Sequence, residues 1–136
     1  MINILRFFKM KIAISQINPK IGDLDGNINK IISFINKAID KNADIVVFSE
    51  LAITGYPPRD LLDFEYFVED NIKQLEVLAE YSHKIAIICG FISKNTTGKG
   101  KKYHNSAAFI HKGKILHTYN KSLLPFYDVF DETRYF

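Results

Sequence analysis

The sequence has little of several features that would assign a class of function. It contains one cysteine, Cys89, among 136 residues, which excludes an internal disulfide framework and suits a reducing cytosol. No apolar run approaches the roughly 18 residues that a membrane-spanning helix needs. The net charge is only +3, and part of it comes from one lysine-rich stretch, Lys94–Lys102, which we interpret as a solvated loop. These absences favour a cytoplasmic protein with no membrane or nucleic-acid partner.

Motifs for phosphate or metal binding are also missing. The Gly-Lys-Gly-Lys-Lys at residues 98–102 lacks the spaced first glycine and the Ser/Thr of a P-loop. The four histidines show no ligand spacing such as H-E-x-x-H. If the chain forms a hairpin that turns at Lys112-Gly113, His111 pairs with Lys114 and His117 pairs with Ala108. This pairing puts the two histidines on opposite faces of the hairpin. We therefore predict no metal site.

What is present is an alternation of strand and helix patterns in a chain long enough for about one domain. Lys11–Ile17 is typical of a buried strand, and Ala43–Phe48 is typical of a second one. Between them, a turn with capping side chains at Gly22–Asn27 precedes an amphipathic helix over Ile28–Ile39. Strand, helix and strand in this order predict a parallel sheet. Residues 1–9 are expected to be an N-terminal extension, and 10–136 the domain.

The second half of the chain is more varied. A helix is predicted over Phe64–Tyr81, followed by a third strand over Lys84–Phe91. Strands at Asn105–Ile110 and Lys114–Tyr119 flank Lys112-Gly113, which predicts a two-residue hairpin turn. The apolar anchors expected along the second helix are Phe67, Ile72, Leu75, Val77 and Leu78. The last 14 residues are rich in Phe and Tyr and show no clear helical or strand period.

Glu50 is the first candidate for a functional residue. It follows an apolar run that ends at Phe48, and a buried strand gains no stability from a glutamate at its end. In open α/β sheets, binding sites gather at the carboxyl ends of the strands. Position alone also allows Glu50 to point into water or to cap the next segment.

Lys121 is the second candidate, because it ends the hairpin strand and precedes a loop rich in Tyr and Phe. Such a loop can form the wall of a small-molecule pocket. A glutamate and a lysine at the same rim can serve as base and oxyanion stabiliser if a nucleophile lies between them. On position alone, a solvent-exposed lysine remains an alternative.

Several motifs carry a resemblance to a known family. The segments are Lys11–Pro19 (KIAISQINP), Val46–Pro58 (VVFSELAITGYPP), His104–Ala108 (HNSAA) and Tyr119–Lys121 (YNK). Together they resemble the nitrilase, or carbon-nitrogen hydrolase, superfamily. The longer segments Gly55–Leu62 and Leu124–Phe136 resemble one branch, the amino-terminal glutaminase domain of glutamine-dependent NAD synthetases.

The resemblance implies an α/β fold, a partial α-β-β-α sandwich of which this chain is roughly the first half. It implies a glutamate–lysine–cysteine triad in which Glu50 is the general base and Lys121 stabilises the tetrahedral oxyanion. By the same matching, the residues expected to bind the glutamine substrate are Tyr56, Tyr127, Phe130 and Glu132, with Glu132 facing the substrate ammonium. No cofactor is expected in this chain, because ATP and Mg belong to the synthetase domain of the family.

The third member of the triad has no match in the sequence. The family nucleophile lies downstream of the lysine, whereas Cys89 lies between Glu50 and Lys121. Strand alternation places Cys89 in an apolar row with Ile85 and Ile87, and nothing cationic adjoins it to lower its pKa. We therefore interpret Cys89 as structural, and we expect a truncated or split product without glutaminase activity of its own.

Two alternatives remain open from the residues. One is an amidase piece from another nitrilase branch that acts on a different amide or nitrile. The other is a non-catalytic remnant, or a half that complements a second polypeptide. An incomplete sheet leaves an unpaired edge and exposed apolar surface, so we expect the chain alone to self-associate, aggregate or be partly molten. A doubly wound binding protein fits poorly, because the tail is irregular and no dinucleotide glycine motif occurs.

Overall fold

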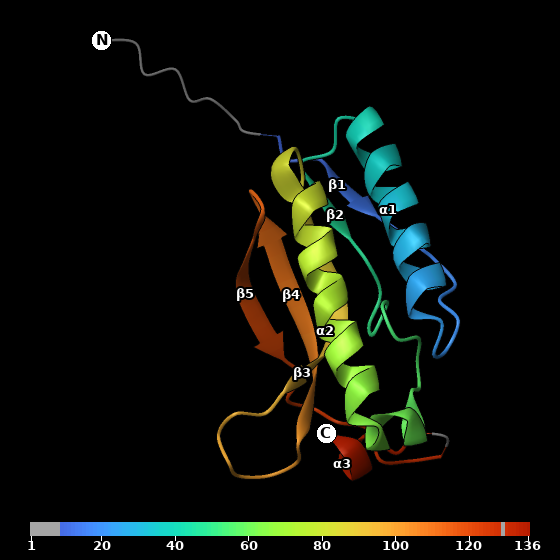
Figure 1. The fold of residues 1–136 in the computed structure, drawn as a ribbon. Helices are drawn as coiled ribbons and strands as arrows, with labels where there is room; N and C mark the ends of the chain where they lie inside the picture. Colours follow the sequence, from blue (N-terminus) through green and yellow to red (C-terminus); the bar gives the residue numbers. More distant parts are fainter. Residues whose placement is uncertain (1–8, 129) are drawn as a thin grey trace.

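The computed structural model describes residues 9–128 and 130–136, so the expected extension at residues 1–9 lies almost entirely outside the described residues. Two helices cover one face of a mixed sheet (Figure 1). Short 3-10 helices occupy Arg59–Asp63 and Tyr81–His83. The other elements are β1 (Ile12–Ile14), α1 (Leu24–Asp40), β2 (Ile45–Val47), α2 (Glu65–Glu80), β3 (Ala86–Lys94), β4 (Tyr103–His111), β5 (Lys114–Asn120) and α3 (Glu132–Tyr135).

The five strands lie in the sheet in sequence order. β1, β2 and β3 are parallel, as the strand–helix–strand pattern predicts, and β3, β4 and β5 are antiparallel. The helices that connect the parallel strands, α1 and α2, lie side by side on the same face of the sheet (Figure 1). The strand ends that carry Glu50 and Lys121 are therefore held in one rigid sheet.

Helix α1 begins earlier than its apolar period indicates. The Asp23 carboxylate accepts a hydrogen bond from the Gly26 N–H at 3.0 Å, so the predicted turn supplies the N-cap and the helix starts at Leu24. Ile31 and Ile35 are fully buried against the sheet. This confirms the amphipathic reading of the segment.

Helix α2 is close to its predicted bounds, but one of its expected anchors is wrong. Val77 is 37% exposed, whereas Val68 is fully buried. Val68, Leu75 and Leu78 lie on one stripe of the helix at i, i+7 and i+10. Val77 is rotated about 100° from Leu78 and leaves that stripe, which the apolar character of the residue alone does not reveal.

The opposite face of the sheet is not covered by any helix of the described chain. One residue from each strand forms a row across it, and we call these five residues the uncovered row. The register that aligns them is Ile14–Val47–Ile88–Phe109–His117. The prediction of a buried first strand is therefore wrong for two of its residues, because Ile12 is 54% and Ile14 is 77% exposed. An apolar run shows that a strand is suited to burial, but not that a second layer covers it.

The hairpin turn is confirmed, but one predicted pair is not. Lys112 and Gly113 have φ of 53° and 74°, the conformation of a type I′ turn. His111 pairs with Lys114 as expected, whereas His117 pairs with Phe109 and not with Ala108. An irregularity at Phe109/Ile110 shifts the register by one residue.

Among the described residues, none of the helices has the length and apolar character required to cross a bilayer.

Candidate active site

Glu50 lies just beyond the carboxyl end of β2, on a segment that crosses directly over β3. The crossing is possible because residue 90 is a glycine. A Cβ at Gly90 would meet the Leu51 nitrogen and lie 2.6 Å from the Ser49 carbonyl oxygen. Leu51, which is fully buried, has φ of 44° and turns the chain immediately after the glutamate. Left-handed backbone is strained in a non-glycine residue, and strain of this kind clusters at functional sites.

Lys121 follows β5, and its backbone N–H donates to the Asn105 carbonyl at 2.8 Å, which extends the ladder between β4 and β5 by one step. The structure brings the two predicted catalytic residues together, because Lys121 Nζ donates to Glu50 Oε1 at 2.7 Å. Both side chains are partly accessible, with 32% of Lys121 and 43% of Glu50 exposed. They meet at the rim of the sheet, where each strand ends.

Glu132 is the third member of this charge cluster. It begins the short helix α3, its side chain is only 4% exposed, and its N–H donates to the Pro125 carbonyl. Lys121 Nζ lies 3.0 Å from both of its carboxylate oxygens, but only the contact to Oε1 has hydrogen-bond geometry. One ammonium therefore joins two carboxylates.

The cluster fixes the protonation of its lysine. Burial lowers the pKa of Lys121, but the hydrogen bonds and negative charges of Glu50 and Glu132 outweigh it, so the pKa is raised above the ordinary lysine value. Lys121 is a stable ammonium at neutral pH. This is the form that stabilises a developing oxyanion and cannot act as a base.

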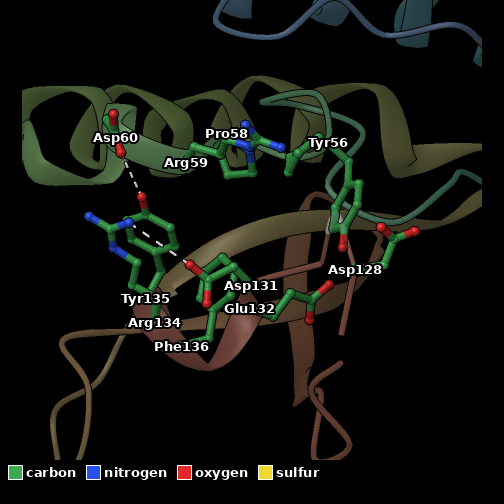
Figure 2. Close-up of a pocket in the computed structure, with 11 residues that line it drawn as sticks. Tyr56, Pro58, Arg59, Asp60, Asp128, Asp131, Glu132, Arg134, Tyr135 and Phe136 are labelled. Carbon is green, nitrogen blue, oxygen red and sulfur yellow. Dashed lines mark hydrogen bonds and ion pairs between the residues drawn. The ribbon is translucent and has the colours of Figure 1, made fainter. Parts of the chain in front are cut away.

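The four residues expected to contact substrate gather around the same cluster. The Tyr56 side chain points toward Glu132 (Figure 2), and burial, followed by the hydrogen bond and charge of Glu132, raises the pKa of Tyr56. The Phe130 ring lies 6.3 Å from that of Tyr56 and 5.5 Å from that of Tyr127, centroid to centroid. The loop before α3 thus places an aromatic wall beside the charged residues.

These residues line three separate hollows of the surface. Glu50 and Lys121 line one of about 270 Å³, together with Asn105 and Tyr119, and it opens on the uncovered face near Ile88. Tyr56 and Glu132 line a second of about 330 Å³, shown in Figure 2. Tyr127 lines a third of about 590 Å³. Lys121 and Glu132, which contact each other, form the wall between the first two.

Cys89 does not belong to this arrangement. It is fully buried in the core between the sheet and the helices, beside Ile87 and Ala108. The residues on either side of it, Ile88 and Gly90, line the hollow of Glu50, so alternation turns the thiol to the opposite face. Burial raises the pKa of Cys89 to about 12. The thiol is therefore protonated and out of reach, as its sequence context predicts.

No cluster of three or more His, Cys, Asp or Glu side chains suited to a metal occurs among residues 9–128 and 130–136. The groups that do converge are the Glu50 carboxylate, the Lys121 ammonium and the Glu132 carboxylate. Such a set can remove a proton from a nucleophile and stabilise a negatively charged oxygen. It holds no nucleophile of its own.

Two residues of the site were missed by sequence reasoning, although one of them, Asn105, lies in a quoted motif. Asn105 donates to Glu50 Oε1, and Gly90 admits the segment that carries Glu50. A polar residue inside the apolar pattern of β4 was the available signal for Asn105. Gly90 gave none, because its φ is ordinary and its role depends on a segment 40 residues away.

The sequence model of the carbon-nitrogen hydrolase family matches residues 11–136. Among characterised proteins, the chain is 37% identical over 130 residues to the glutamine-dependent NAD(+) synthetase of Thermotoga maritima, and it is 43% identical over 129 residues to that of Synechocystis. These alignments cover 94% and 92% of this chain but only 22% and 23% of the relatives. The chain therefore spans about a fifth of the length of these relatives.

A solved structure agrees with these matches. The glutamine-dependent NAD+ synthetase of Acinetobacter baumannii superposes with a TM-score of 0.79 at 35% identity, covering 93% of this chain and 23% of that one. The matched part is the amino-terminal hydrolase portion of such synthetases. Since the family match extends over nearly all of the described residues, the chain belongs to the carbon-nitrogen hydrolase family.

Proposed function

We propose that this chain supplies the base and the oxyanion-stabilising residue of a glutamine-hydrolysing site, and that the attacking thiol comes from a polypeptide segment outside these 136 residues. The observation that carries the proposal is the contact of Lys121 Nζ with Glu50 at 2.7 Å and with Glu132 at 3.0 Å. An ammonium held between two carboxylates, at the rim where the ends of the strands form sites, is the arrangement of charge that a base and an oxyanion-stabilising residue require.

The proposed chemistry is acyl transfer to sulfur. Glu50 accepts the thiol proton, and the thiolate attacks the amide carbon of glutamine. The carbonyl oxygen becomes an oxyanion, which the Lys121 ammonium stabilises. Glu50 then returns the proton to the leaving nitrogen, and ammonia departs. Water, deprotonated by Glu50, attacks the thioester and releases glutamate and the thiol.

Substrate recognition is proposed for the residues around the cluster. Tyr56, Tyr127 and Phe130 provide the aromatic wall, and Glu132 would face the α-ammonium of glutamine. Supporting this, Glu132 Oε2 is buried and has no contact with hydrogen-bond geometry among the described residues, although Lys121 Nζ lies 3.0 Å from it. A ligand ammonium would supply the hydrogen bond that this oxygen lacks. In a larger protein, the released ammonia would serve an ATP-dependent synthetase domain that makes NAD in the cytoplasm.

The partner proposed for the uncovered row is the polypeptide that carries the thiol. The row is apolar over four of its five positions, and it is continuous with the hollow of Glu50 and Lys121 through Ile88. A second sheet packed there would bury Ile14 and Tyr119, which are 77% and 64% exposed. Without that partner, the same surface favours self-association.

The relatives allow a direct experiment. This chain is joined to the remainder of the Thermotoga maritima synthetase, in place of the 130 residues that it matches, and ammonia release from glutamine is measured. We expect activity in the hybrid, and its loss by at least about a hundredfold in Glu50→Gln and in Lys121→Met. An active hybrid that tolerates both substitutions would overturn the proposed roles. Equal turnover of glutamine and acetamide would favour an amidase of another branch.

A further inference from the structure

Asn105 holds both residues of the proposed catalytic pair at once. It lies on β4 opposite Ile92 of β3 and is only 4% exposed. Its side-chain amide donates to Glu50 Oε1 at 2.5 Å, while its backbone carbonyl accepts from the Lys121 N–H at 2.8 Å. A single strand residue therefore fixes the side chain of one partner and the backbone of the other.

The hydrogen bonds to Glu50 are unequal between its two oxygens. Oε1 accepts from Asn105 and from Lys121, whereas no donor within the described residues reaches Oε2. The amide is a neutral donor, so it orients the carboxylate without adding a charge to the cluster. Oε2 is therefore the oxygen of Glu50 that remains available to accept a proton.

Two other asparagines, Asn27 and Asn71, are fully buried and have purely structural contacts. Asn27 bonds to the backbone of Lys20 and Ile53, and Asn71 bonds to the backbone of Val68 and Ile92. Each therefore ties its own helix to a loop or a strand through main-chain groups. Asn105 differs from them because its amide is directed to a charged side chain.

We propose that Asn105 is a positioning residue that presents Glu50 Oε2 as the atom that accepts the thiol proton. In the step, the S–H bond breaks, its electron pair stays on sulfur, and the proton forms a bond to Oε2. The proton-accepting role rests on the proposed function, but the holding of Glu50 by Asn105 does not. The two can therefore be tested separately.

The holding of Glu50 is tested on the 136-residue chain itself, by competitive acetylation of its lysines with mass-spectrometric readout across pH 8 to 11. Asn105→Leu keeps the number and branching of the side-chain heavy atoms but removes the amide donor. Because 43% of its side chain is exposed, Glu50 is then free to rotate into solvent. Lys121 loses part of its contact with the Glu50 carboxylate, which contributes to its raised pKa. We expect Lys121 to acetylate about three- to tenfold faster at pH 9, since one pKa unit changes the reactive fraction about tenfold.

The chain contains its own controls. Lys94 and Lys73 owe their raised pKa values to Glu65, Glu69 and Asp70, away from Asn105, so their acetylation should not change. Ser106→Ala alters the next residue of β4, which bonds to Ser93 and Asn120, and should leave Lys121 unchanged. In a Glu50→Gln background, Asn105→Leu should add nothing.

Every outcome decides the proposal. Unchanged acetylation of Lys121 in Asn105→Leu, or an equal change in the Glu50→Gln background, overturns it. If Asn105→Leu unfolds the chain, the acetylation of Lys94 also changes, and Asn105→Ser then replaces it with the same expectation for Lys121. In the active hybrid, Asn105→Leu should lower kcat rather than raise KM. A change in KM alone would retain the holding of Glu50 but refute its role in proton transfer.

Discussion

The ammonium of Lys121 lies 2.7 Å from Oε1 of Glu50, although 71 residues separate the two in the sequence. The sheet produces this contact, because β2 and β5 end at the same rim and Asn105 of β4 lies between them. The contact depends on the register of the four strands from β2 to β5, so variants that disturb the register or the ion pair should have separable effects.

Lys121→Met should destabilise the chain because it leaves Glu132 as an unpaired carboxylate with 4% exposure. Removing one partner of a fully buried ion pair costs about 3–5 kcal/mol, and since Lys121 is one-third exposed we expect about 2 kcal/mol. Urea unfolding at pH 7 measures this. Lys121→Met combined with Glu132→Gln should recover most of the loss, and an unchanged midpoint in Lys121→Met would contradict the account.

The same ion pair should make stability depend on alkaline pH. Because the pKa of Lys121 is raised above 10.5 in the folded state, its contribution to stability is complete below 10.5 and is lost as the pH rises through the raised value. Between pH 10 and 12, the free energy of unfolding should therefore fall less steeply in Lys121→Met than in the unaltered chain. Parallel pH profiles would show that the ammonium is not stabilised by folding.

Gly90→Ala should displace the segment that carries Glu50. The added Cβ would lie 2.6 Å from the Ser49 carbonyl oxygen, which is backbone and cannot rotate away. We expect a loss of about 2–3 kcal/mol in urea unfolding, the upper range for overpacking. Gly98→Ala is the control, because its Cβ meets nothing within 4 Å and only its φ of +71° opposes the change. A larger loss at Gly98 would refute the crossing.

Cys89 should be unreactive in the folded chain. With its pKa raised to about 12 by burial, the thiolate is about one part in ten thousand at pH 8. Iodoacetamide at pH 8 should therefore label Cys89 only after urea is added. Rapid labelling without urea would show that the thiol reaches the surface, and would reopen its assignment as a structural residue.

The uncovered row should drive association of the isolated chain. Ile14 belongs to the row, and Ile12 lies two residues before it on the same face of β1. Ile12→Thr together with Ile14→Thr changes residues that are 54% and 77% exposed, so it should shift sedimentation toward the monomer with little loss of stability. Val46→Thr, on the same sheet but fully buried on the helix side, should instead lower the urea midpoint. A monomeric unaltered chain with a sharp melting transition would contradict the expectation of self-association.

How far the sequence predicts this structure depends on the range of the interaction. The α1 cap, the parallel strands and the Lys112-Gly113 turn follow from local patterns, and Glu50 and Lys121 follow from the rule that strand ends form sites. Gly90 and Asn105 could not be found in this way, because their roles arise from contacts with segments about 40 and 55 residues away. The exposure of Ile14 could not be predicted, because an apolar run does not show whether a second layer covers the strand.

The central claim is that the 136 residues hold a base and an ammonium but no usable nucleophile, and ammonia release from glutamine by the purified chain tests it most directly. We predict no release by the chain alone, and release when the chain is joined to the rest of the Thermotoga maritima synthetase. Turnover by the 136-residue chain that disappears in Cys89→Ser would contradict the claim, because it would make the buried thiol the nucleophile.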